Sequence, residues 1–182
     1  MDPRLTENSL IKSLADLTAP LTEARKVPVS ARLVLDTNIV LDLFYWGDAR
    51  VGDLKQALAS KAFLAVISRE TLAELIDVLL RAPFLQTPEQ IQAIVLSYLS
   101  LSCRESDRED LCPVRCKDVN DQKFLNLATQ CACPLITRDK HLLKLAKKMR
   151  RFGVHVTTPE KLQEHSVAAA SKAKMTAAVR FK

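Results

Sequence analysis

The feature that most constrains the fold is a series of short, continuously apolar runs alternating with longer segments of helical periodicity. Each run is too short for a helix and is bounded by turn or capping residues, as strands are. The expected strands cover residues 33–35, 63–68, 134–137 and 154–156. Strands without a polar side belong to sheets covered on both faces. We therefore predict an α/β fold: a parallel β-sheet flanked by helices on both faces, in three Rossmann-like layers.

The intervening segments carry the spacing and end signals of helices. They are expected to start at residue 38 and to span 51–60, 69–80, 88–101, 121–131 and 140–151. Residues 102–117 are polar and are expected to be irregular.

The chain divides into one core-forming unit and two extensions. Its 182 residues, 48% of them hydrophobic, suffice for one sizeable core, which we assign to residues 32–163. Residues 1–31 form an N-terminal extension, in which apolar residues recur at helical spacing between prolines, as in a short amphipathic helix. Residues 164–182 form a basic tail rich in Ala and Lys.

Charge is unevenly distributed along the chain. Residues 138–182 hold twelve Lys or Arg against three Asp or Glu, a net charge of +9, and the formal charge of +6 leaves −3 for the first 137 residues. A basic third indicates a polyanionic partner such as nucleic acid, although it also serves solubility, and the acidic remainder suggests a place for a cation.

Other features favour a cytoplasmic protein without a membrane partner. The first residues lack the basic and apolar regions of a signal peptide, and no apolar stretch is long enough to span a bilayer. The five cysteines are odd in number and fit a reducing compartment. Their spacings differ from those of common zinc sites, so we expect buried thiols.

Acidic residues occur where the predicted strands end. Asp36 follows strand 33–35, Asp139 follows strand 134–137, and Asp121 opens helix 121–131. In parallel sheets such positions share one edge, where loops converge and helices begin. Each acid alone could instead be a turn or helix-capping residue.

The helix at 69–80 adds further acids on its polar face. These are Glu70, Glu74 and Asp77, and periodicity does not choose among them. Several carboxylates held close together repel one another unless a cation neutralises them. Oxygen ligands suit Mg²⁺ or Mn²⁺, and such a cation supports hydrolysis of a phosphodiester.

Four segments together carry a family resemblance. LVLDTNIVLDLF, SRETLAEL, DVNDQKFLNLA and PLITRDKHLLKL occur in the order and spacing of a PIN domain. The resemblance covers about residues 32–162 and is strongest to the bacterial toxin branch of toxin–antitoxin systems, the VapC-like ribonucleases.

The resemblance implies the following site. Catalytic and metal-binding roles fall to Asp36, Glu74, Asp121 and Asp139, with Asp118 as an auxiliary carboxylate and Thr37, Asn38 and Thr137 as supporting residues. It also implies RNA as substrate, a cognate antitoxin protein as inhibitor, and a homodimer.

The basic segment near residue 140 offers a candidate RNA contact. Its cations, expected on the exposed side of helix 140–151, are Lys140, Lys144, Lys147, Lys148 and Arg151. They could follow the RNA backbone or simply form a solvated helix face. Tyr45 and Trp46 could contact a base, although a core position is the expected one for Trp46.

The sequence thus predicts a ribonuclease that depends on Mg²⁺ or Mn²⁺. The alternative is a PIN-like module that binds RNA or protein without cutting; the retained acids argue against it. A phosphotransfer domain with Asp36 as acceptor would leave Glu74 and Asp139 unexplained.

Overall fold

The fold is a single parallel sheet covered by helices on both faces. The computed structural model describes residues 18, 20–108 and 111–162, and the sheet in this part of the chain has the strand order β3-β2-β1-β4-β5, all parallel. The strands are β1 (Arg32–Leu35), β2 (Leu64–Ile67), β3 (Ser102–Arg104), β4 (Leu135–Ile136) and β5 (Val156–Thr157). The predicted α/β class is confirmed.

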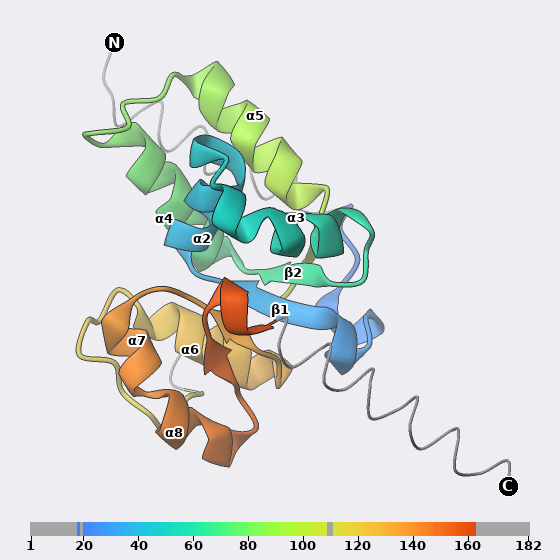
Figure 1. Cartoon of the computed structure of the whole chain (residues 1–182), viewed down its shortest axis with the longest axis vertical. Coiled ribbons are helices and arrows are strands. Elements are labelled where there is room, and N and C mark those ends of the chain that lie inside the picture. Colours follow the sequence, from blue (N-terminus) through green and yellow to red (C-terminus); the bar gives the residue numbers. More distant parts are fainter. Residues whose placement is uncertain (1–17, 19, 109–110, 163–182) are drawn as a thin grey trace, which may run out of the picture.

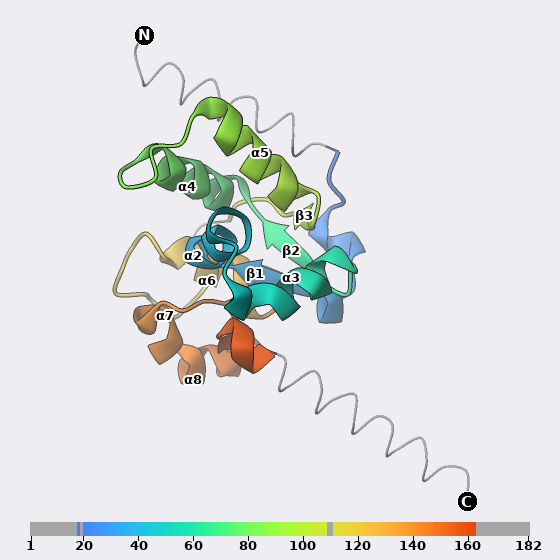
Figure 2. The same ribbon diagram turned by 45° about the horizontal axis from the view of Figure 1, so that its top comes forward.

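Two groups of helices form the outer layers (Figure 1). One face is covered by α2 (Thr37–Leu41), α3 (Gly52–Ala59), α4 (Arg69–Leu80) and α5 (Pro88–Leu99), and the other by α6 (Gln122–Cys131), α7 (Lys140–Lys144) and α8 (Ala146–Met149). Successive strand residues serve opposite faces, so Leu33 and Leu35 lie in the first core and Val34 in the second. Both cores are fully apolar along β1, as the continuous run predicted. Figure 2 shows the same layers from a tilted direction.

Helix α4, which carries one of the predicted site acids, has strong local determinants. Ser68 and Thr71 form a capping box at its start, and its bounds agree with the prediction for 69–80. Its apolar stripe is buried, at Leu72, Leu75, Ile76 and Leu79. Glu74 is therefore held on a helix whose rotation is set by core packing.

Two elements differ from the sequence-based expectation. Strand β3 lies in the region that was expected to be irregular. The sequence did not indicate this strand, because Ser-Cys-Arg is not an apolar run. In the structure β3 pairs with β2, and Cys103 is fully buried. The helix expected at 140–151 is broken at Leu145 into α7 and α8, followed by a 3-10 turn at Arg150–Phe152. Leu142 and Met149, on either side of the break, are both fully buried. Other predicted element ends lie within two residues of the observed ones.

The extensions are described only in part. The predicted N-terminal helix falls largely, and the basic tail entirely, outside the described residues. Within the described portion, Ala24 and Val27 are buried in the second core. The backbone of Glu23 forms an isolated parallel β-bridge with Arg104, the last residue of β3. All five cysteines are free thiols, of which Cys116 alone is not buried. Among the described helices, none has the length and apolarity needed to cross a membrane.

Candidate active site

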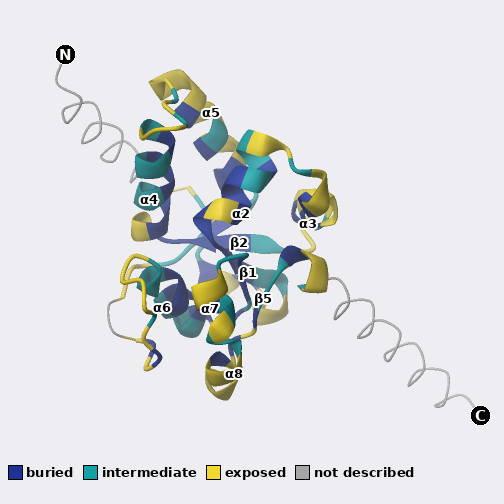
Figure 3. Cartoon of the chain, turned by 60° about the vertical axis from the view of Figure 1, so that its left-hand side comes forward, coloured by how far each residue is buried: buried dark blue, intermediate teal, exposed yellow. Residues whose placement is uncertain are grey.

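The four predicted acids lie close enough to influence one another electrostatically. Figure 3 shows the elements that carry them, with α2, α4, α6 and α7 around the strands of the sheet. Asp36 lies at the centre, directly after β1, and is 3% exposed. Its backbone N–H donates to Ile136 O at 3.0 Å, and its Oδ2 accepts a hydrogen bond from Thr137 Oγ1 at 2.7 Å. Pairing between β1 and β4 thus fixes the carboxylate.

Asp36 is electrostatically unfavourable in its ionised form. Its pKa is raised from 3.8 to about 6, mainly by burial and further by repulsion from Glu74 and Asp139, while the Thr137 hydrogen bond opposes the rise. A buried carboxylate without a compensating cation is costly, so the site favours binding of a positive charge.

Glu74 points from the middle of α4 towards the same edge. Its Oε1 accepts a hydrogen bond from Thr37 Oγ1 at 2.9 Å, and its Oε2 forms an ion pair with Lys123 Nζ. The side chains of Glu74 and Lys123 are 17% and 22% exposed. Thr37 therefore acts through Glu74, whereas Asn38, the other predicted companion, is exposed at the start of α2.

Asp121 and Asp118 approach from the segment before α6. The pKa of Asp121 is raised from 3.8 to about 6, first by burial and then by the charges of Asp36, Asp118, Asp139 and Glu74. Asp118 is exposed, and its Oδ1 accepts a hydrogen bond from Asn120 N–H at 2.9 Å. The auxiliary acid thus lies at the rim and acts on Asp121 through its charge.

Asp139 has both a structural and a candidate functional role. Its Oδ1 caps α7 by accepting from the N–H groups of His141 (2.6 Å) and Leu142 (3.1 Å). Its own N–H donates to Thr137 Oγ1 at 2.9 Å, so Thr137 links Asp139 to Asp36. Oδ2 of Asp139 has no hydrogen-bond partner among the described residues. Asp139 is therefore a helix-capping residue through Oδ1, as the alternative proposed, while Oδ2 is available to bind a cation.

The donor set fits a hard divalent cation, although the carboxylates are not drawn together as ligands. Within the described part of the chain, no three Asp, Glu, His or Cys side chains are grouped closely enough to hold a metal ion as they stand. Three of the four acids instead take a protein donor: Thr137 for Asp36, Lys123 for Glu74, and the α7 amides for Asp139. The site is rich in carboxylate oxygens, the ligands that Mg²⁺ and Mn²⁺ prefer. The pKa values of Asp36 and Asp121 are raised first by burial and then by repulsion from neighbouring acids, and a bound cation would relieve both effects.

Two residues at the site were not anticipated from the sequence. Lys123 lies two positions after Asp121, but its partner Glu74 is 49 residues away in the chain, so no local pattern indicated the contact. Cys116 Sγ lies 4.0 Å from Asp121 Oδ2, and burial raises the pKa of this thiol. Only the packing of α4 against α6 brings Lys123 to the acids.

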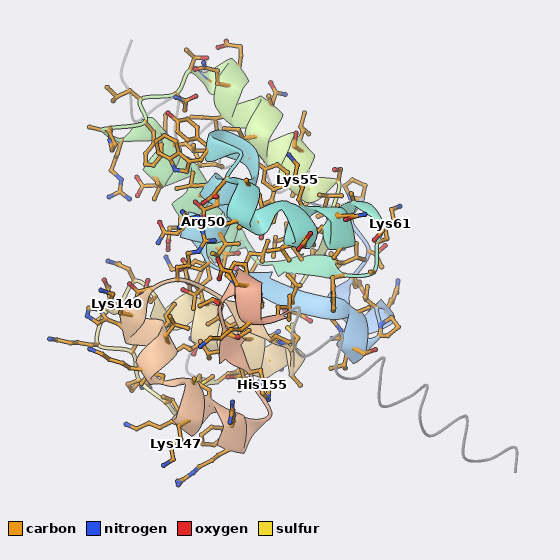
Figure 4. All side chains as sticks on the ribbon, in the orientation of Figure 1. Arg50, Lys55, Lys61, Lys140, Lys147 and His155 are labelled. Atoms are coloured by element: carbon orange, nitrogen blue, oxygen red, sulfur yellow. The ribbon has the colours of Figure 1, made fainter. Side chains whose placement is uncertain are left out.

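The predicted basic residues do not form a single helix face. Lys140 and Lys144 lie on α7, Lys147 and Lys148 on α8, and Arg151 in the 3-10 turn. All five are exposed. In Figure 4 the labelled Lys140 and Lys147 point away from the sheet.

Trp46 corrects another expectation. It is 61% exposed instead of lying in the core, and it is the last residue of a π-helical turn at Asp42–Trp46. Its ring packs edge-on against Tyr45, with centroids 4.5 Å apart, and is tilted on Phe84 at 5.8 Å.

In the described part of the chain, a five-stranded parallel sheet with interacting acids around its carboxyl edge defines an α/β domain with an acidic candidate active site. Residues 32–141, more than half of the chain, match the family model described as "PIN domain". The chain therefore belongs to the PIN domain family, and hence to a superfamily of nucleases. In a comparison with curated proteins, no sequence matched. The predicted family is confirmed, whereas the VapC-like toxin branch remains a prediction.

Proposed function

We propose that this PIN domain is a ribonuclease that depends on Mg²⁺ or Mn²⁺ and that it acts in the cytoplasm as the toxin of a toxin–antitoxin pair. The proposed metal-dependent catalysis is supported by the environment of Asp36. This carboxylate is 3% exposed, and its pKa is raised to about 6 by burial and by repulsion from Glu74 and Asp139. A buried carboxylate that lowers the stability of the fold is explained if its function is to bind a cation.

The residues that would hold the cation are Asp36, Glu74, Asp121 and Asp139, with Asp118 at the rim. When bound, the cation supplies Lewis-acid activation of water and neutralises charge on the phosphodiester. The chain contributes orientation: Thr137 Oγ1 donates to Asp36 and accepts from the Asp139 N–H. No side-chain nucleophile is required.

Lys123 has a further role in this proposal. Its ion pair with Glu74 places a positive charge beside that carboxylate before a cation binds. An ammonium group here can also donate to a phosphate oxygen of RNA. Both roles place the positive charge of Lys123 at the point where the substrate's negative charge enters.

The test is cleavage of a fluorescent single-stranded RNA by the purified protein with Mg²⁺ or Mn²⁺, against a chelator control. Asp36→Asn and Asp139→Asn should fold and lose metal-dependent cleavage. Asp53→Asn, a matched change at an exposed acid on α3, should retain it. Full cleavage by either site variant would refute the proposed catalysis.

The Lys123–Glu74 pair also supports a second candidate, a PIN-like module that binds RNA or protein without cutting. In such a module Lys123 would permanently take the place of a cation beside Glu74. RNA binding that is indifferent to chelator, with no cleavage in any metal, would favour it.

The toxin role has its own test. Expression in a bacterial host should arrest growth, and Asp36→Asn should relieve the arrest. An antitoxin, if present, should co-purify and cover the acidic pocket, and a homodimer should appear in solution at micromolar concentration. Harmless expression of an active nuclease would argue against the toxin role alone.

A further inference from the structure

A cavity of about 750 Å³ lies beside the acidic site, at the ends of β2 and β3. Its wall includes four arginines from three separate segments, namely Arg25, Arg69, Arg104 and Arg108. We call it the arginine groove. It was not anticipated, because the sequence drew attention to the lysines after residue 140.

The groove adjoins the candidate active site through Lys123. A second, smaller hollow shares Ser68, Ser106 and Arg108 with it and ends at Lys123. Both hollows include Gln130, seven residues along α6 from Lys123, which corresponds to about 10 Å of helix. Lys123, which contacts Glu74, and Arg108 line this smaller hollow together with the acids Glu70 and Asp107.

The acids that line the groove are already engaged by the protein. Glu23 pairs with Arg25 at 2.6 Å. Asp107 Oδ1 accepts from the N–H of Glu70 in the first turn of α4, at 3.2 Å. Glu105 Oε1 accepts from the N–H and hydroxyl of Ser106, at 2.9 and 3.2 Å.

The remaining arginines are not matched in this way. Among the described residues, Arg69 and Arg108 form no ion pair and are exposed. Arg104 also faces the groove, and its Nε is buried without a hydrogen-bond partner within the described part of the chain. The exposed guanidinium groups of Arg69 and Arg108 are suited to phosphate oxygens, which such groups bind through paired N–H donors.

We propose that the arginine groove receives the sugar–phosphate backbone of single-stranded RNA on one side of the scissile bond. The inference rests on the proposed ribonuclease function and adds the path of the substrate. Arginine contacts to phosphate give affinity without base preference, so the groove sets strand position and length dependence. Among the described residues that line the groove none is aromatic, which favours backbone contact over base stacking.

The test compares three double variants of the full chain that each remove two positive charges. Arg69→Gln with Arg108→Gln alters the groove. Lys147→Gln with Lys148→Gln alters the candidate track predicted from the sequence. Lys55→Gln with Lys61→Gln is a control on the side of α3, which lies opposite α4 and α6 in Figure 3. All are made in Asp36→Asn, so that RNA is bound without being cut.

Binding of a labelled 12-nucleotide single-stranded RNA is measured by fluorescence anisotropy over a range of KCl concentrations. We expect the groove variant to weaken binding at least tenfold. The slope of the logarithm of the association constant against the logarithm of the salt concentration should become smaller by about 1.4, the change expected when two phosphate contacts to a single strand are lost. The Lys55 and Lys61 variant should change affinity less than twofold.

The possible outcomes separate this inference from the proposed function. Unchanged binding by the groove variant, or a larger loss in the Lys147 and Lys148 variant, would overturn the groove while leaving the ribonuclease intact. RNA that the wild-type protein neither binds nor cuts would refute the ribonuclease and the groove together. Arg104→Gln, tested separately with its melting temperature, should add to the loss if the fold is retained.

Discussion

Replacing Asp36 with asparagine is expected to stabilise the folded protein. The pKa of Asp36 is about 6 in the folded chain against an ordinary value of 3.8, chiefly because the carboxyl group is buried. Between these pH values the folded chain binds more protons than the unfolded chain, so the free energy of unfolding falls as pH rises. The loss reaches its full size about one pH unit above the folded pKa of about 6, where both states are ionised.

The size of the effect follows from the shift. About two pKa units correspond to about 3 kcal/mol, with little screening because Asp36 is only 3% exposed. Asparagine has nearly the same shape and an oxygen that can accept from Thr137. The free energy of unfolding of Asp36→Asn should therefore exceed that of wild type by about 3 kcal/mol at pH 7.5. The difference should be about half as large at pH 5 and under about 1 kcal/mol at pH 4. At pH 7.5 this corresponds to about 6 to 12 °C in melting temperature.

The assay is urea unfolding followed by circular dichroism, in EDTA, at the three pH values. Asp53→Asn should change the free energy of unfolding by less than about 0.5 kcal/mol, because the residue is exposed. Adding Mn²⁺ should stabilise wild type and narrow the gap, by about 2.7 kcal/mol at one hundred times the dissociation constant. A variant no more stable than wild type at pH 7.5, with a gap independent of pH, would refute the reasoning.

Three other substitutions test neighbouring contacts. Lys123→Met should lower the free energy of unfolding by about 1–3 kcal/mol in EDTA, because Glu74 loses its charged partner, and Mn²⁺ should recover part of the loss. Thr137→Val should raise the pKa of Asp36 above about 6, observable by carboxyl NMR titration, and an unchanged pKa would contradict the hydrogen-bond assignment. Trp46→Ala should cost less than about 1 kcal/mol, where a core tryptophan would cost about 3–5 kcal/mol.

Local sequence information was sufficient where a short segment carries its own signal. Helix α4 has a capping residue, an apolar stripe and a following proline in sequence, and its predicted bounds were confirmed. Strand β3 has none of these, because three residues containing Ser and Arg do not form an apolar run. Its partner β2 and the buried Cys103 define it only after folding. Trp46 was expected in the core because residue type was the sole guide, and in the structure it ends the π-helical turn and is exposed.

The sequence by itself determined the α/β class, the PIN family and the positions of the acids after their strands, because strand periodicity and motif spacing are local properties. The tertiary structure alone decided which charges meet. Lys123 reaches Glu74 across 49 residues, and Thr137 reaches Asp36 across 101. The arginines of the groove likewise come from separate segments, which the pairing of β2 with β3 and the β-bridge between Glu23 and Arg104 bring together. Burial and Coulomb interactions depend on distances in space, so the pKa of Asp36 and the path proposed for RNA could be argued only from the folded chain.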